Sequence, residues 1–162
     1  MIIHKFETAH MEHLEFAATG RVPYSEILRQ RDALLTPAMQ AVVEGTPTPM
    51  IFFNDAMQVI HANKAALNVV AESCVENVIG LRMGEFLGSR HSMGGAACKN
   101  PGECQNCNSM RAIQDALGGI AGKHDMQLVM DPDSKTPRLF QIGATPVPVG
   151  ATAYAMVTLE QL

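Results

Sequence analysis

The stretch "MIFFNDAMQVIHANKAAL", residues 50–67, carries the clearest local pattern in the chain. It contains two short runs of strand-forming residues, 50–55 and 57–63, which meet at an Asn-Asp turn signal. The run that follows, residues 64–71, has the pattern of a short helix. The stretch therefore predicts a β-hairpin followed by a helix.

On the N-terminal side of this stretch, apolar side chains recur at the seven-residue spacing of an amphipathic helix, at Leu28, Leu35 and Val42. Thr36 and Pro37 interrupt the pattern, because proline fits badly inside a helix and well at its first position. We therefore expect one helix to about Leu35 and a second over residues 37–44, with Thr36 as its N-cap.

On the C-terminal side, the pattern predicts short turns and a short helix over 71–87, a longer helix over 108–120, and alternating strands over 124–131, 137–147 and 152–162. The stretches "DPDSKTP" and "PVPVGA" are expected to form the turns between these strands. Strands grouped at both ends of a helical middle predict an α+β fold with an antiparallel sheet.

The composition limits the classes of protein to which the chain can belong. Of 162 residues, 47% are hydrophobic and 17% charged, as expected for a globular chain with one core. The net charge of −4 and the lack of Lys/Arg clusters argue against nucleic-acid binding. No apolar run approaches the ~20 residues of a membrane span, and the N-terminus lacks a signal-peptide pattern, so we expect a cytoplasmic protein. We expect no enzyme, because the sequence shows no Ser/His/Asp arrangement, paired catalytic carboxylates or phosphate-binding loop.

Three of the four cysteines lie close together in "CKNPGECQNC", at Cys98, Cys104 and Cys107. Zn²⁺ and iron–sulfur clusters usually take four donors and favour thiolates, and His91 is the nearest candidate for the fourth donor. Without a metal, a C-x-x-C pair at the start of a helix has a lowered thiol pKa and suits a thiol–disulfide switch. Metal or cluster binding, a redox switch, and reduced thiols with only a structural role are therefore three open hypotheses.

Three other side chains are assigned simpler roles. Cys74 is expected to be a small buried apolar residue. His61 is expected to be a hydrogen-bonded histidine of a strand rather than a ligand. Glu85, which lies near Arg82 and Arg90 in the sequence, is expected to belong to an ordinary surface charge set.

Three segments together resemble the PAS sensor family. "AVVEGTPTPMIFFNDAMQVIHANKAAL" (41–67) is similar to the opening of a PAS domain, "NVIGLRMGEFL" (77–87) to a later segment, and the last three strands to its closing half-sheet. The resemblance implies a five-stranded antiparallel sheet with helices on one face. It further implies that Asn63 ties the second strand to the next helix. Residues 41–162 would form the sensor domain, and residues 1–40 an N-terminal arm and amphipathic helix.

The cysteine-rich segment resembles that of a PAS subgroup with a cluster in the loop before the long helix. The subgroup is expected to read G-E-x-x-x-C-x-H, then C, then C-x-x-C, whereas this chain reads "GEFLGSRH" with Ser89 in place of the first cysteine. Zinc or an iron–sulfur cluster is therefore a candidate cofactor that would need a donor other than that cysteine.

The resemblance also implies a function. PAS modules sense a signal and pass it to an output such as a kinase, and here the cysteine-rich loop would read redox state or a metal. The alternative is a small metal- or iron–sulfur-binding redox protein on a PAS scaffold. PAS modules often form homodimers through N-terminal helices, so residues 24–44 predict a homodimer; a helix that covers its own core is the competing interpretation.

Overall fold

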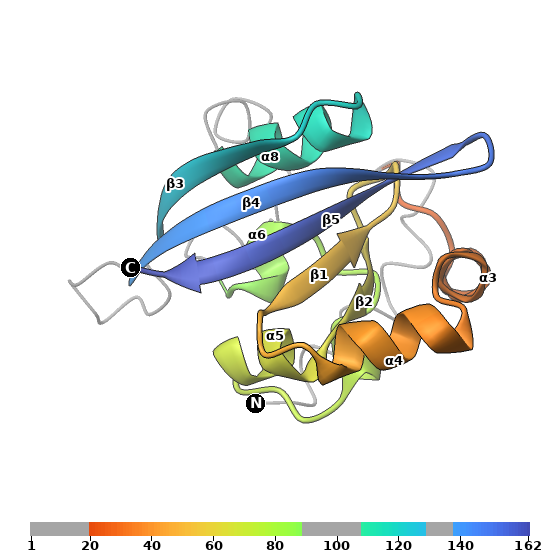
Figure 1. The fold of residues 1–162 in the computed structure, drawn as a ribbon, viewed down its shortest axis with the longest axis horizontal. Helices are drawn as coiled ribbons and strands as arrows, with labels where there is room; N and C mark the ends of the chain where they lie inside the picture. Colours follow the sequence, from red (N-terminus) through yellow and green to blue (C-terminus); the bar gives the residue numbers. More distant parts are fainter. Residues whose placement is uncertain (1–19, 89–107, 129–137) are drawn as a thin grey trace.

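The computed structural model describes residues 20–88, 108–128 and 138–162 (Figure 1). Its elements, in chain order, are helices α3 (Tyr24–Leu34) and α4 (Pro37–Gly45), strands β1 (Met50–Phe53) and β2 (Val59–Ala62), helix α5 (Lys64–Val69), the short 3₁₀ helix η1 (Val75–Asn77), helices α6 (Met83–Phe86) and α8 (Asn108–Leu117), and strands β3 (Gly122–Leu128), β4 (Arg138–Val149) and β5 (Thr152–Gln161). Within these ranges, every helix is too short or too polar to cross a bilayer.

The strands form one five-stranded sheet in the order β2-β1-β5-β4-β3, and every neighbouring pair is antiparallel (Figure 1). The predicted hairpin is confirmed, because Ile51 of β1 pairs with Ala62 of β2. Strand β5 pairs with β1, which makes the last strand in the sequence the central strand of the sheet. The α+β prediction of a five-stranded antiparallel sheet is therefore confirmed.

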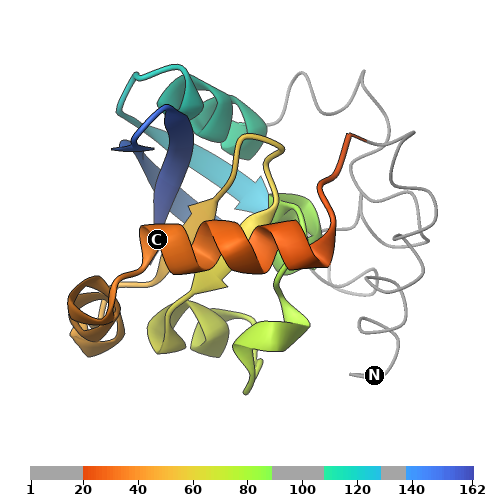
Figure 2. The same ribbon diagram turned by 90° about the vertical axis from the view of Figure 1, so that its right-hand side faces the viewer.

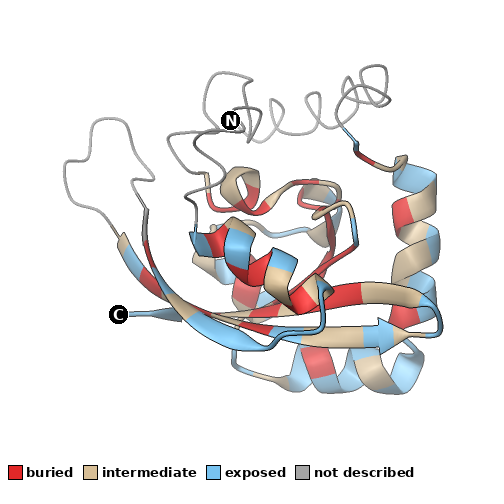
Figure 3. Ribbon diagram, turned by 90° about the horizontal axis from the view of Figure 1, so that it is seen from above, coloured by how far each residue is buried: buried red, intermediate tan, exposed pale blue. Residues whose placement is uncertain are grey.

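One face of the sheet, called the inner face here, is covered by α5, α6 and α8. It carries Ile51, Phe53, Ile142 and Val157, all fully buried. The three helices, with Leu87 at the C-cap of α6, contribute a set of buried side chains to the same cluster: Ala66, Leu67, Met83, Phe86, Leu87, Ala112, Ile113 and Ala116. Figure 3 shows α8 on one side of the sheet and the largely exposed α4 on the other.

The opposite face, called the outer face here, is covered at its β1–β2 end by α3 and α4 (Figure 2). A second buried cluster joins the two helices to the sheet: Ile27, Leu34, Leu35, Val43, Phe52, Ile60, Ile79 and Tyr154. The burial of a side chain of this size stabilises a fold by about 1.5–3 kcal/mol. We call residues 20–45 the N-terminal extension. Of the residues at the predicted seven-residue spacing, Leu35 is buried in this cluster and Leu28 packs against it, whereas Val42 is 69% exposed.

The predicted helix boundaries are confirmed at α4. Oγ1 of Thr36 accepts a hydrogen bond from the backbone N–H of Met39 at 3.3 Å, and Pro37 is the first helical residue. The helix ends at Gly45, within one residue of the predicted end at Glu44. The sequence-based boundary between residues 40 and 41 therefore falls inside this helix, and the division into two domains stays a prediction.

One predicted turn is shorter than expected. The strand predicted over 137–147 continues in the structure through Val149, so that only Gly150 and Ala151 of "PVPVGA" form the turn. Pro146 and Pro148 still pair with β5, but they lie beyond the last pair of β3 with β4, Gly122 with Ala144. This part of β4 is therefore a sheet edge, where proline, which lacks a backbone N–H, is tolerated. The second predicted turn, "DPDSKTP", lies outside the described residues.

Candidate functional site

The four residues predicted from the sequence to bind a metal or respond to redox state, Cys98, Cys104, Cys107 and His91, lie outside the described residues. The described chain reaches this segment through α6 and leaves it through α8. Both helices pack on the inner face, where Phe86 and Ile113 are buried. Within the described residues, no group of three or more His, Cys, Asp or Glu side chains could hold a metal ion.

Cys74 is exposed, so the prediction of a buried apolar residue is wrong. It directly precedes η1, and its thiol donates a hydrogen bond to Oε2 of Glu76 at 2.6 Å. That hydrogen bond, with the negative charge of the carboxylate, raises the pKa of the Cys74 thiol. The thiol is therefore held in its less reactive protonated form.

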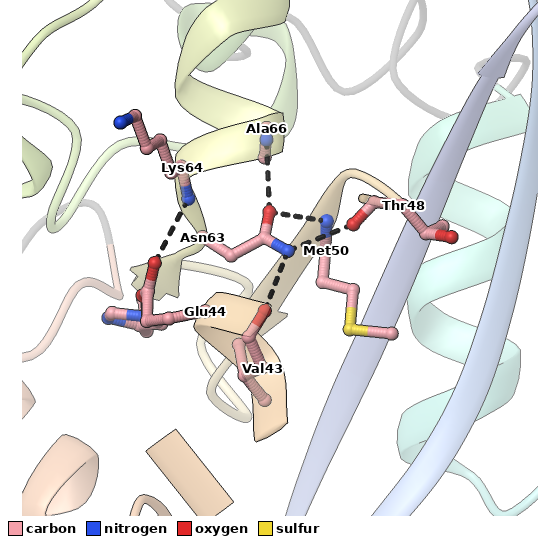
Figure 4. Close-up of polar contacts among 8 residues, drawn as sticks. Val43, Glu44, Thr48, Met50, Asn63, Lys64 and Ala66 are labelled. Atoms are coloured by element: carbon pink, nitrogen blue, oxygen red, sulfur yellow. Dashed lines mark hydrogen bonds and ion pairs between the residues drawn. The ribbon is translucent and has the colours of Figure 1, made fainter. Parts of the chain in front are cut away.

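Asn63 follows β2 and caps α5, as the resemblance implied, and it also bonds to the end of α4 and the start of β1 (Figure 4). Its Oδ1 accepts hydrogen bonds from the backbone N–H groups of Ala66, at 2.9 Å, and Met50, at 3.0 Å. Its Nδ2 donates to the carbonyl oxygens of Val43, at 3.0 Å, and Thr48, at 2.9 Å. The side chain is fully buried, and its hydrogen bonds cap α5 and hold the end of α4 against the start of β1.

Glu44 and His61 form a second contact at the same place. Nε2 of His61 lies 2.7 Å from Oε1 of Glu44. Oε2 of Glu44 accepts from the backbone N–H of Lys64 at 3.2 Å (Figure 4). The prediction of a hydrogen-bonded strand histidine is therefore confirmed. Burial lowers the pKa of His61, and the hydrogen bond that its Nε2 donates to Glu44 offsets this only in part.

Glu85 is not part of a surface charge set, contrary to the prediction. Its carboxylate pairs with both terminal nitrogens of Arg21, at 2.8 Å for Nη2–Oε1 and 3.1 Å for Nη1–Oε2. The side chains of Arg21 and Glu85 are only 3% and 10% exposed. The fold brings the two together across 64 positions of sequence, which no local pattern indicates.

The residue after Arg21 is held by a side-chain clamp. Oε1 of Gln58 accepts from the backbone N–H of Val22 at 2.7 Å, and its Nε2 donates to the carbonyl oxygen of the same residue at 3.4 Å. Further along, Nδ2 of Asn54 donates to Oε1 of Gln30 on α3 at 2.9 Å. Polar contacts therefore hold the N-terminal extension at its start, its middle and its end.

The chain was compared with known proteins. No family model and no curated protein match it. A solved PAS domain of a protein from Colwellia psychrerythraea is similar over 78% of this chain and 95% of its own length, with 11% sequence identity and a TM-score of 0.54. The structure of an RNA-binding light-oxygen-voltage receptor is similar over 80% of this chain and 34% of its own length, with 13% identity and a TM-score of 0.56. The likeness to these structures, with the sheet order above, shows that the chain has the PAS fold.

Proposed function

We propose that the chain is a cytoplasmic sensory PAS module in signal transduction, regulatory rather than catalytic. Its signal is redox state or a metal, read by Cys98, Cys104 and Cys107, with His91 as the fourth donor when zinc or a cluster is bound. The fold supports the sensory role, and one structural neighbour is itself described as a receptor. The closely spaced thiols support the redox or metal signal.

The observation that carries the proposal is the position of the cysteine-rich segment in the chain. It connects α6 to α8, and both helices bury side chains in the inner-face cluster. Oxidation of the thiols or loss of a metal changes the conformation of a short segment between two packed helices. Packed cores respond to such changes by switching between discrete arrangements, which turns a local event into a signal.

The output is a kinase or another signalling domain, and the module acts as a homodimer through its N-terminal helices. The buried side of α3 is already used within the chain, so a second copy would contact the exposed side of the N-terminal extension. That side includes Val42 of α4, which is 69% exposed. An apolar side chain of this size in water is available for a contact between copies.

Elemental analysis and visible absorption of the protein purified without oxygen test the proposal. Stoichiometric zinc in a colourless protein supports a metal-loaded sensor loop. Absorption from an iron–sulfur cluster favours the second candidate, a redox protein on a PAS scaffold, because three thiolates and an imidazole suit such a cluster. If no metal is found, mass spectrometry after oxidant treatment should detect a disulfide within the segment.

Cysteine variants test whether metal binding or disulfide formation depends on the cysteine-rich segment. Serine replacement of Cys98, Cys104 and Cys107 together should abolish metal binding or disulfide formation, while Cys74→Ser should leave both intact. The redox or metal mechanism is wrong if the triple variant and the unchanged protein give the same metal content, the same oligomeric state and the same response to oxidant.

A further inference from the structure

We infer that the ion pair between Arg21 and Glu85 couples α6 to the N-terminal extension, so that a displacement of α6 loosens the attachment of α3. The regulatory meaning of this coupling rests on the proposed function, which makes the segment after α6 the sensor. The coupling itself rests only on contacts among described residues. It gives the proposed module a specific route from the inner face of the sheet to the outer face.

The geometry of the pair favours strong coupling. Arg21 presents two nitrogens to two carboxylate oxygens, and both side chains are nearly excluded from water. Two hydrogen bonds in parallel fix orientation as well as distance. A charge left buried without its partner is strongly unfavourable, so neither residue can move far while the other stays in place.

On the α6 side, the pair reaches the helix and the turn before it. Oε2 of Glu85 also accepts from the backbone N–H of Arg82 at 2.6 Å, at the start of α6. Nη1 of Arg21 donates to the carbonyl oxygen of Gly80 at 3.1 Å. Gly80 is itself bonded to the edge of β2, through its N–H to the carbonyl oxygen of Val59 at 2.8 Å. Arg21 therefore contacts both α6 and the turn that holds it on the sheet.

On the α3 side, hydrogen bonds hold the short segment that connects Arg21 to α3. Val22 is held by Gln58, and the carbonyl oxygen of Pro23 already accepts a hydrogen bond from the N–H of Ile27, in the first turn of α3, at 3.0 Å. Ile27 is fully buried and approaches Gly80, so that a Cβ placed on Gly80 would lie 3.5 Å from its Cδ1. A shift of Arg21 therefore acts on the first turn of α3 rather than being absorbed by a loose linker.

Hydrogen exchange of the full chain, followed by mass spectrometry, tests the coupling in both directions. Glu85→Gln keeps an oxygen that can accept from the N–H of Arg82, so α6 retains its N-terminal hydrogen bond while the ion pair is lost. This variant should raise exchange in α3 by about tenfold. Arg21→Gln should raise exchange in α6 by a similar factor, because coupling between two sites is reciprocal.

Three further variants complete the test. The double variant should show less than the product of the two single effects, because both remove the same contact. Arg29→Gln is the matched control: it breaks the ion pair of Arg29 with Glu26, whose side chains are 77% and 31% exposed, and should change exchange in α6 by less than about twofold. If a neutral variant does not fold, Arg21→Lys keeps the charge but loses the paired geometry, and should give a smaller increase in α6.

The inference is overturned if Glu85→Gln changes hydrogen exchange only within α6 and Arg21→Gln changes it only in the residues around position 21. It is also overturned if the exchange increase in the double variant equals the product of the increases in the two single variants. No oxidant or metal is used, so this outcome leaves the sensor hypothesis standing. Conversely, a reciprocal effect combined with an inert cysteine-rich segment would support the coupling while contradicting the proposed function.

Discussion

Nε2 of His61, on β2, lies 2.7 Å from Oε1 of Glu44 in the last turn of α4. The other ring nitrogen of His61, Nδ1, is buried and has no hydrogen-bond partner among the described residues. A neutral imidazole fits this site, because one nitrogen donates to the carboxylate and the other carries only a lone pair. A protonated imidazole would bury an N–H donor without an acceptor, which is unfavourable.

The stability of the protein should therefore fall as the solution becomes more acidic. Burial holds the native pKa of His61 below its ordinary value, and the positive charge of Arg31 acts in the same direction, whereas Glu44 and Glu76 favour protonation. The unfolded chain binds the proton more readily, so the free energy of unfolding drops as pH falls below about 6.5 towards the native pKa. Urea unfolding between about pH 5 and about pH 8 measures this slope.

His61→Gln provides the control for this prediction. Its amide can still donate to Glu44 but does not titrate, so the slope below neutral pH should be shallower than in the unchanged protein. The other histidines are present in both proteins and cancel in the comparison. Equal slopes in the two proteins would contradict the assignment of the effect to His61.

Asn63→Ala should destabilise the protein by about 3 kcal/mol, because it removes the cap of α5 and leaves buried carbonyl groups unsatisfied. Asn63→Asp is the informative companion variant. It keeps an oxygen for the N–H groups of Ala66 and Met50, but places a second oxygen against the carbonyl oxygens of Val43 and Thr48. We expect it to be destabilised at neutral pH and partly restored in acid. An Asp variant as stable as the parent at neutral pH would show that the amide donor has little weight.

Local signals explain what the sequence could predict. Thr36 before Pro37 places both the cap and the start of α4 within two positions, and the structure follows the pattern. Asn63 stands directly before α5, where a side-chain oxygen caps a helix, so its position alone indicates that role. The contacts of its Nδ2 with Val43 and Thr48 are not local, so neither the spacing nor the resemblance indicated them.

The wrong predictions concern residues whose environment is set by distant parts of the chain. Glu85 looks like a surface residue until the fold brings Arg21 against it. Cys74 looks like a small apolar residue, but it lies in an exposed turn beside Glu76, where the carboxylate offers a better contact than the core. Pro148 indicates a turn by propensity, and only the end of β3 at Gly122 shows why β4 can extend through it.

Ile27→Ala should cost about 3 kcal/mol, since the side chain is 1% exposed and its removal leaves a cavity between α3 and the sheet. Val42→Ala, at a site 69% exposed, should change the free energy of unfolding by less than about 0.5 kcal/mol.

A chain beginning at residue 41 should be much less stable than the full chain, because the loss of α3 exposes Phe52 and Ile60. Similar urea midpoints for the short and full chains would show that the N-terminal extension contributes little.

The proposed homodimer gives a separate prediction for Val42. Val42→Asp places a charge on the exposed side of α4 and should convert a dimer to a monomer without a loss of stability. Sedimentation at several concentrations measures the oligomeric state. Lys123→Asp serves as the control, because it changes the charge of an exposed residue on β3, at the edge of the sheet opposite to β2. A monomer for the unchanged protein, or a dimer for both variants, would contradict an interface at α4.

Cys74 should react slowly with alkylating reagents although it is exposed. The hydrogen bond to Glu76 raises its thiol pKa, so less thiolate, the nucleophile, is present near neutral pH than in a free cysteine. Glu76→Gln should speed the alkylation of Cys74 and move its pH profile to lower pH, because the negative charge next to the sulfur is removed. Glu72→Gln is a useful control, since the charge of Glu72 has a weaker influence on the same thiol.

Alkylation rates followed site by site with mass spectrometry distinguish Cys74 from the other three cysteines. If the pH profile of Cys74 alkylation is unchanged in Glu76→Gln, the thiol does not donate to Glu76 in solution. Cys74 could then not serve as the unreactive cysteine with which the reactivity of Cys98, Cys104 and Cys107 is compared.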